Sequence, residues 1–520
     1  MRKISDFIFV VTSMLLASSL LAGAASAQWS QARSENFIFV GDYTERGAEV
    51  VVAELEEYRA VIFEILGLEQ QAERIPIPIY GVRSPDALQR ATGNSFAAGI
   101  YTTSREGPVF GLSLDGGFVQ SSPARATAYH EFAHHLVATY TDQVYPLWYN
   151  EGLADYLSTF EVTRRGKIKL GQPSEGRVWV LENRGWMSMD ALVGSIRRYP
   201  FGNNESGATR ASAANFYAQS WLAAHYINSE PGMSDKFGAY LEGLNSEAVS
   251  DGGFEQSFGM TPSEFGTELR AYLRRNRFLT RSGTLDATSR NPTISVRKLS
   301  RAETDFHQGE LTRRFYRNEE GQALAESHYQ KSETAGGPIA DISAARALLA
   351  AQAEDFDTAF AQIGKAIKAD PQNSRLYQIA GQVYLEAYLE DGRDIARIDE
   401  ARVYLRRALD LDEDNVAAHY FYAATYAAAD DLPTERAYMA AIEASRYYRS
   451  SNFTDSNLKL AEVLMRSRAA PFARNILEKA RVWSQNARTR SLAKEELVVL
   501  DDMLAGRRPI YPSPGGDRSN

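Results

Sequence analysis

The sequence predicts an α+β domain followed by an all-α region of helical repeats. Strand and helix signals alternate over residues 36–114, two helices follow over residues 124–160, and the alanine-rich sequence after residue 300 repeats itself. The chain has 520 residues, enough for roughly two to four domains. With 44% hydrophobic and 24% charged residues, it has the composition of a globular protein and not of a disordered or fibrous one.

The composition excludes several classes of function. The net charge is -9, and an acidic balance argues against a nucleic-acid-binding protein, whose affinity usually depends on a basic face. The chain has no cysteine, which excludes disulfides, thiolate metal sites and cysteine nucleophiles. Only 7 histidines occur, and His130, His134 and His135 lie close together.

The first 27 residues are predicted to be a signal peptide. Arg2 and Lys3 are followed by an apolar run over residues 7–21, and residues 25–27 (Ala-Ser-Ala) give a small-x-small cleavage pattern. The alternative is an uncleaved membrane anchor. We expect an exported protein, periplasmic or secreted, with no membrane contact after cleavage.

The strand signals of the first domain fall into four segments. Pro76 and Pro78 interrupt the second strand-like segment, residues 75–80, and predict an edge position because proline donates no ladder hydrogen bond. A turn over residues 104–107 separates the last two segments. The helix between the first two predicted strands spans residues 51–65. The predicted strands are residues 36–40, 75–80, 99–102 and 108–114.

The second half of the chain carries a repeated pattern of small residues. Ala359, Ile363 and Ala366 define it, and it returns at Ala401, at Ala473 and, relaxed, at Thr434. The pattern resembles the tetratricopeptide repeat, a helix–turn–helix unit of about 34 residues. Residues 390–399 fit an insertion in the first interval. A helical bundle without repeats is the alternative.

These patterns predict five segments. Residues 280–297 are rich in serine, threonine and arginine without periodicity, which is typical of a connector. The predicted boundaries are 1–27 for the signal peptide, 28–279 for the α+β domain, 280–319 for the connector, 320–485 for the helical repeats, and 486–520 for a terminal helix and disordered tail.

Residues 130–134, His-Glu-Phe-Ala-His, form an H-E-x-x-H motif. On a helix, His130 and His134 project from one face and can bind one metal ion, whereas Glu131 lies about 100° further round, where a general base belongs. Imidazole nitrogens suit Zn²⁺, which needs a third protein ligand at a catalytic site. Glu151 on the next helix can supply it, and Asp155 can accept a hydrogen bond from a zinc histidine.

This spacing, together with the run Asn150-Glu151-x-x-x-Asp155, resembles the gluzincin clan of zinc metallopeptidases, which includes thermolysin and the aminopeptidase-N type. The resemblance is specific over residues 125–160. It implies a zincin-like metallopeptidase domain, zinc held by His130, His134 and Glu151, Glu131 as the base that activates water, and supporting roles for Asp155 and Asn150.

The resemblance also implies a donor for the oxyanion and a strand that binds substrate. In this clan a tyrosine or histidine of a later helix stabilises the oxyanion, so Tyr217 and His225 are the candidates, with core packing as the alternative for each. The predicted strand over residues 108–114 would pair with a peptide or protein substrate. His135 points away from the ligands and is expected to pack or to support them.

Three hypotheses remain open from the sequence. The first is an exported zinc metallopeptidase whose repeats recruit a substrate or a protein partner. The second is a catalytically silent exported scaffold in which the zinc domain is a relic. The third is an aminopeptidase or another metal-dependent hydrolase, although the Gly-Ala-Met-Glu-Asn-like stretch typical of such aminopeptidases is not found.

Overall fold

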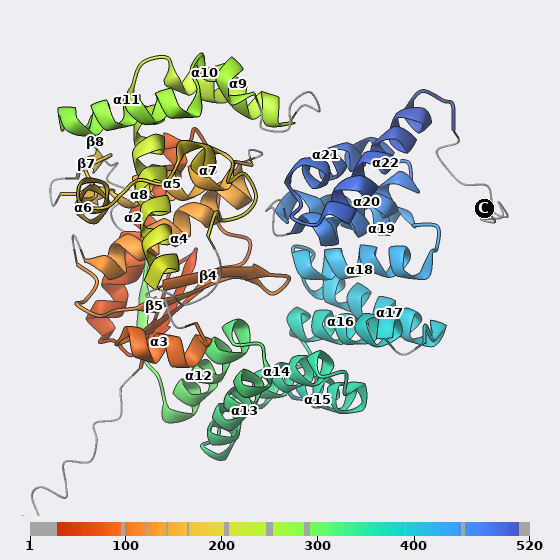
Figure 1. Cartoon of the computed structure of the whole chain (residues 1–520). Coiled ribbons are helices and arrows are strands. Elements are labelled where there is room, and N and C mark those ends of the chain that lie inside the picture. Colours follow the sequence, from red (N-terminus) through yellow and green to blue (C-terminus); the bar gives the residue numbers. More distant parts are fainter. Residues whose placement is uncertain are drawn as a thin grey trace, which may run out of the picture.

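The computed structural model describes residues 29–94, 99–119, 122–141, 144–163, 166–201, 207–245, 253–284, 292–390, 392–448 and 453–508. The predicted signal peptide and the predicted tail from residue 509 lie outside the described residues. An α+β part, residues 29–298, precedes an all-helical region, residues 301–508 (Figure 1). This arrangement confirms the coarse fold prediction.

A six-stranded mixed sheet forms the centre of the α+β part, in the order β4-β5-β3-β2-β1-β9. The pairs β2–β3 and β3–β5 are parallel, whereas β1–β2, β1–β9 and β4–β5 are antiparallel. A small antiparallel sheet has the order β6-β7-β8. The strands are β1 (Ser30–Arg33), β2 (Phe37–Gly41), β3 (Ile77–Val82), β4 (Gly99–Ser104), β5 (Gly107–Ser113), β6 (Glu161–Val162), β7 (Lys167–Leu170), β8 (Arg281–Thr284) and β9 (Ser295–Lys298).

Helices cover both faces of the six-stranded sheet because its central strands bury side chains on both sides. Phe37 and Phe39 pack into the main core with residues of α2 (Glu45–Ile65) and α4 (Pro123–Tyr140). Val40 points to the other face and packs with Leu88 of α3 (Pro85–Thr92) and Leu311 of α12 (Arg301–Phe315). The sheet therefore lies between two helical layers.

The edge position predicted for residues 75–80 is wrong, because β3 lies between β2 and β5. Pro76 precedes the strand, and the pairing of β3 with β5 begins only at Ile79. Both prolines thus come before that ladder, and proline at the start of a strand is tolerated.

The predicted connector, residues 280–319, contains regular structure. Strand β8 joins the small sheet, β9 joins the edge of the large sheet, and α12 packs on the large sheet beside α3. Both strands are mostly exposed, so they lack the apolar alternation by which a strand is recognised in a sequence.

The remaining helices of the α+β part contribute buried side chains to the main core. Gly253, in a left-handed conformation, precedes α10, whereas Gly252 lies outside the described residues. These helices are α5 (Leu147–Ser158), α6 (Glu175–Asn183), α7 (Met189–Val193), α8 (Gly207–Ser229), α9 (Met233–Asn245), α10 (Phe254–Phe258) and α11 (Pro262–Arg275).

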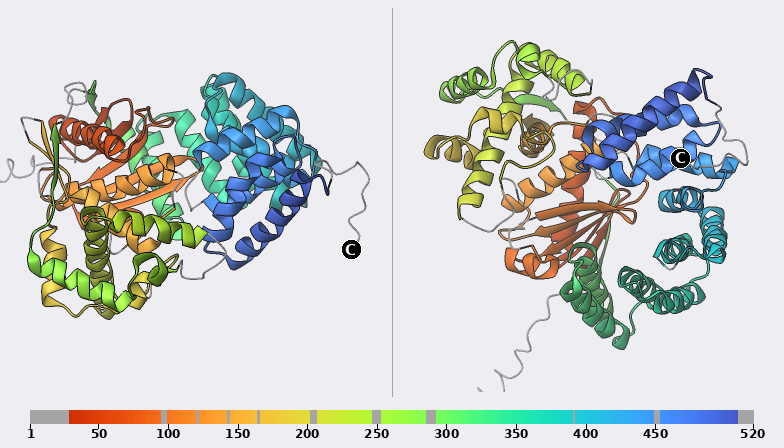
Figure 2. Two further views of the ribbon diagram at one scale, coloured as in Figure 1. Left: turned by 90° about the horizontal axis from the view of Figure 1, so that it is seen from above. Right: turned by 45° about the vertical axis from the view of Figure 1, so that its right-hand side comes forward.

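In the helical region, successive helices pack against one another and curve beside the α+β part (Figure 2). The small residues of the sequence pattern are buried between helices, as at Ala359, Ala401 and Ala473. None of the described helices is long and apolar enough to cross a bilayer. After α12 come α13 (Glu319–Thr334), α14 (Ile339–Gln352), α15 (Phe356–Ala369), α16 (Ser374–Glu390), α17 (Ile395–Leu411), α18 (Val416–Ala429), α19 (Glu435–Tyr447), α20 (Thr454–Met465), the 3₁₀ helix η3 (Ala470–Phe472), α21 (Ala473–Trp483) and α22 (Ala487–Leu504).

Candidate metal centre

Helices α4 and α5 carry the residues of the predicted site. Helix α4 begins at Pro123, and the Ser122 side chain caps it by accepting a hydrogen bond from the Arg125 N–H. Helix α5 has no side-chain cap. Its first N–H groups, of Leu147 and Trp148, donate instead to the carbonyls of Ile196 and Ser195. The loop at residues 195–196 therefore fixes the start of α5.

Gly152 sets how closely α5 approaches α8. A Cβ atom at this position would overlap the Ser220 carbonyl of α8. A side chain here would push the two helices apart and move Glu151, the neighbouring residue. The glycine in the sequence Asn-Glu-Gly-Leu therefore has a packing reason.

Three side chains of α4 and α5 bring ligand atoms together. The Glu151 Oε2 atom lies 3.2 Å from His130 Nε2 and 3.3 Å from His134 Nε2, and the two nitrogens are 3.1 Å apart. His130, His134 and Glu151 form a group that can hold a metal ion. The three residues that the sequence predicts as ligands therefore lie within metal-binding distance of one another.

Asp155 fixes the orientation of His130. The His130 Nδ1–H donates to Asp155 Oδ1 at 2.9 Å, which leaves the Nε2 lone pair available to bind a metal ion. Arg177 of α6 donates to both oxygens of the same carboxylate, at 2.7 Å and 3.2 Å. The carboxylate is buried, and Arg177 compensates its charge.

The charges of the site are strongly coupled. Burial opposes ionisation of Glu151, but the two histidines outweigh burial and hold the pKa of Glu151 well below its usual range. Burial likewise opposes the imidazolium of His130, yet its hydrogen bonds to Asp155 and Glu151 raise the pKa of His130 well above its usual range. The site thus has the negative potential that attracts a cation.

Glu131 differs from the other carboxylates of the site. Burial raises the pKa of Glu131, and the nearby charges of Glu151 and Asp155 add to the increase, while the two histidines oppose it. A carboxylate with a raised pKa is a better proton acceptor than an ordinary one. Glu131 is therefore close to both histidines and more basic than a free glutamate.

Two tyrosines flank Glu151. The Tyr199 hydroxyl donates to Glu151 Oε1 at 2.7 Å. Tyr217 of α8 forms a hydrogen bond with Tyr199, and the Arg177 guanidinium lies 5.1 Å from the centre of the Tyr217 ring. Burial raises the pKa of Tyr217, and the charge of Glu151 adds to the increase, so its hydroxyl stays protonated and can donate. The structure thus brings Tyr217 to the edge of the site.

His225 lies in the core instead. It is fully buried, its Nε2–H donates to the Gly171 carbonyl at 2.9 Å, and its Nδ1 accepts from the Tyr272 hydroxyl at 2.9 Å. Both ring nitrogens are thus used by core contacts. The packing interpretation of His225 fits the structure, and the catalytic one does not.

Two further predicted residues have different surroundings. His135 is buried between Glu73 and Tyr101. Its Nε2 atom lies 3.2 Å from Glu73 Oε2, and its Nδ1 atom lies 3.2 Å from the Tyr101 hydroxyl. It packs behind the ligand face, as expected, and ties α4 to strand β4. Asn150, predicted to support the ligands, forms no hydrogen bond with His130 or His134 among the described residues.

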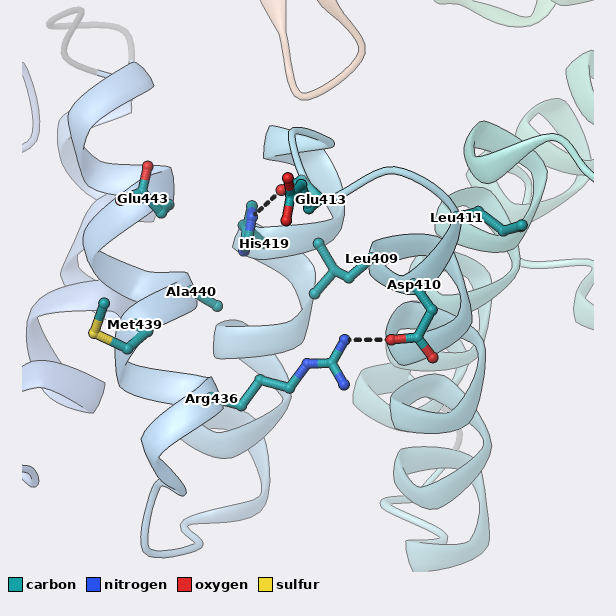
Figure 3. A pocket seen from close by; sticks show the side chains of 9 residues that line it. All are labelled: Leu409, Asp410, Leu411, Glu413, His419, Arg436, Met439, Ala440 and Glu443. Carbon is teal, nitrogen blue, oxygen red and sulfur yellow. Dashed lines mark hydrogen bonds and ion pairs between the residues drawn. The ribbon is translucent and has the colours of Figure 1, made fainter.

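A separate pocket in the helical region holds another histidine, His419 (Figure 3). Its Nε2–H donates to the Glu413 carbonyl at 2.8 Å, while Arg436 pairs with Asp410 at 2.8 Å. These contacts are local to α17, α18 and α19. Among the described residues, His419 does not belong to a group that could hold a metal ion.

Sequence reasoning missed Arg177 and Tyr199. Arg177 follows its partner Asp155 by a loop and a small sheet, so no helical spacing links them. Tyr199 lies in a loop before Pro200, and a tyrosine in such a place carries no periodic signal. The run Arg-Arg-Tyr-Pro-Phe, which puts two aromatic rings beside two charges in a loop, is the one signal that could have indicated Tyr199.

A scan against protein-family models and a search of curated proteins both found no match for this chain.

Proposed function

We propose that the protein is an exported zinc-dependent metallopeptidase with a zincin-like catalytic domain and tetratricopeptide-like repeats. The observation that carries this proposal is the convergence of His130, His134 and Glu151, whose ligand atoms are 3.1–3.3 Å apart. Metal–ligand distances of about 2.0–2.1 Å in a tetrahedron require ligand atoms about 3.3 Å apart. The donor set and its spacing therefore both suit Zn²⁺.

The number of protein ligands supports a catalytic use. Structural zinc sites have four protein ligands, whereas catalytic sites have three and keep one position open. Two imidazoles and one carboxylate converge here. When bound, zinc supplies a Lewis acid that polarises a carbonyl group and acidifies a water molecule.

The residues around the ligands have complementary roles in peptide hydrolysis. Glu131 takes a proton from the attacking water and passes it to the leaving amine, a contribution of roughly 10²–10⁴-fold to the rate. Tyr217, or Tyr199 beside it, donates a hydrogen bond to the oxyanion of the tetrahedral intermediate. Asp155 keeps the His130 ring in place.

Strand β4 is the element best suited to bind a peptide. It pairs with β5 on one side and is the last strand of the sheet on the other, and its residues are half-buried. An extended peptide can add to such an edge through backbone hydrogen bonds. The strand over residues 108–114 cannot take this role as expected, because β5 lies between β4 and β3 and has no free edge. We therefore propose β4 as the strand that binds substrate.

Metal analysis and digestion of unstructured casein test the proposal on the mature chain, with Glu131→Gln and His134→Ala as variants. We expect about one zinc per chain and casein cleavage for the wild type. Glu131→Gln should keep its zinc and lose about 10²–10⁴-fold in rate, whereas His134→Ala should lose the zinc. His419→Ala, in the helical region, is the matched histidine control and should behave as wild type.

The outcome also separates the competing hypotheses. Zinc binding without cleavage by the wild type would favour the silent scaffold. Cleavage that stops when the substrate N-terminus is blocked would favour an aminopeptidase. A Glu131→Gln variant as fast as the wild type would show that Glu131 is not the base.

A further inference from the structure

The helical region contacts the α+β part on two sides of the candidate metal centre. Figure 2 shows it curving from α12 beside the sheet to α21 beside the helices of the α+β part. One contact holds the turn between β4 and β5. The other holds the loop of residues 195–199, which carries Tyr199.

Arg105, in the turn after β4, reaches into the helical region. Its guanidinium lies 3.4 Å from the ring centre of Tyr420, 4.2 Å from that of Tyr448 and 4.4 Å from that of Phe453. It also donates to Asn457 Oδ1 at 3.1 Å, and the Tyr448 hydroxyl donates to the Arg105 carbonyl at 3.0 Å. A cation held between three aromatic rings is strongly fixed.

Glu106, the next residue, is held from the opposite side. Arg313 of α12 donates to both of its carboxylate oxygens, at 2.9 Å and 2.7 Å, and Arg314 donates to the Gly107 carbonyl at 2.8 Å. A bidentate guanidinium–carboxylate pair of this kind fixes the orientation of both groups as well as the distance between them. The turn is therefore bonded to α12 on one side and to α18 and α20 on the other.

The middle of β4 is bonded to the helix that carries the two candidate histidine ligands. The Tyr101 hydroxyl lies 3.2 Å from His135 Nδ1, and His135 follows the ligand His134 directly. Strand β4 thus spans from the metal-ligand helix to the helical region (Figure 1). Any shift of its turn would change the course of the edge to which a peptide would add.

The second contact involves the loop of residues 195–199 and the end of α9. Arg197 donates to the Val482 carbonyl at the end of α21, at 2.5 Å, and Trp483 Nε1–H donates to Asn245 Oδ1 at 3.1 Å. Ile196, beside Arg197, caps α5, and Tyr199 bonds the ligand Glu151. This loop is therefore tied at once to the helical region and to Glu151.

We propose that the helical region positions both walls of the candidate metal site, with Arg105 fixing edge strand β4 and Arg197 fixing the loop of Tyr199. The proposal rests on the proposed function. A cavity of about 700 Å³ lies where β4 meets the helical region, lined by Thr103 and Ser104 of β4 and by helices that include α16 and α18. That volume accepts a short extended segment and not a folded domain. We therefore expect the segment that binds in this cavity to be an unfolded polypeptide.

Peptidase kinetics and hydrogen–deuterium exchange of the full mature chain test this inference, with the variants Arg105→Ala, Arg105→Lys and Arg197→Ala. Arg402→Ala is the matched control, because Arg402 lies 4.0 Å from the Tyr426 ring centre and bonds Asp431, all within the helical region. Urea unfolding and zinc content are measured for each variant, so that a global defect is recognised.

For Arg105→Ala we expect KM to rise about tenfold with kcat within about twofold, because a loosened edge strand weakens binding of the substrate and the transition state alike. Exchange should accelerate over residues 99–104, with zinc retained. Arg105→Lys keeps the charge and should recover part of the affinity. In Arg197→Ala, exchange should accelerate over residues 195–201.

Kinetics and exchange in Arg105→Ala that match those of Arg402→Ala would overturn the inference. A wild type that binds zinc but cleaves no peptide would instead refute the proposed function. The exchange of residues 99–104 and 195–201 would then decide the positioning role by itself, since it needs no turnover.

Discussion

The Nδ1–H of His130 donates to Asp155 Oδ1 over 2.9 Å, and the same carboxylate is held by Arg177. The bond fixes the ring of a candidate ligand and the nitrogen that faces the other ligand atoms. Arg177 in turn keeps Asp155 ionised, since it lowers the pKa of that carboxyl against the effect of burial. The orientation of this candidate ligand on α4 therefore depends on α5 and α6.

We predict that Asp155→Asn binds zinc about 10–100-fold more weakly than the wild type, because an amide accepts the His130 hydrogen bond without a negative charge. Competition with a chelator of known affinity measures the change. Asp190→Asn, on α7, is the control. An unchanged zinc affinity in Asp155→Asn would show that this carboxylate does not support the ligand.

The candidate ligands were predictable because the spacing within each helix is local, and the family resemblance supplied the pairing of the two helices. His130 and His134 are one helical turn apart, and Glu151 and Asp155 repeat that spacing on the next helix. The two strands of the β4–β5 hairpin and their turn were predictable for the same reason. Spacing along one element is a property that a sequence displays directly.

Contacts between distant segments were not predictable. Arg177 and Tyr199 reach the site from α6 and from a loop, and nothing in their spacing refers to Asp155 or Glu151. The central position of β3 was not predicted, because the sequence does not show that the pairing of β3 with β5 begins only after both prolines. Tertiary packing decides such features, and one sequence records it only weakly.

Tyr199 and Tyr217 can be distinguished by removing one hydroxyl at a time. Tyr199 bonds the candidate ligand Glu151, so Tyr199→Phe should weaken zinc binding about tenfold. Tyr217 has no such bond, so Tyr217→Phe should keep the zinc and lower kcat by about 10²-fold if its hydroxyl serves the oxyanion. Zinc titration and steady-state kinetics give the two values. If Tyr217→Phe weakened zinc binding and Tyr199→Phe lowered only kcat, Tyr199 would be the oxyanion donor and Tyr217 the residue that supports the ligand.

Glu310 links stability to pH. Burial opposes its charge, but Arg313 outweighs burial and lowers the pKa of Glu310 from 4.5 to about 2. A carboxyl whose pKa is lowered on folding stabilises the protein above pH 4.5 and loses that effect as pH falls toward 2. The contribution above pH 4.5 is on the order of 3 kcal/mol.

We therefore expect Glu310→Gln to lower the free energy of unfolding by about this amount at pH 7, and the difference from the wild type to shrink between pH 4.5 and pH 2. Urea unfolding at a series of pH values measures it. Glu435→Gln, at an exposed position, is the control. A difference independent of pH would mean that the Arg313 pair does not stabilise the charged form.

Substitution of His225 tests whether this residue belongs to the core or to the catalytic site. His225→Phe keeps an aromatic ring but leaves the Gly171 carbonyl and the Tyr272 hydroxyl without this partner, which should cost at least about 1–3 kcal/mol of stability. Zinc content and kcat of the folded variant should stay at wild-type values, because the ring bonds no candidate ligand. Urea unfolding and kinetics on one preparation measure both. A large fall in kcat without loss of stability would return His225 to the catalytic site.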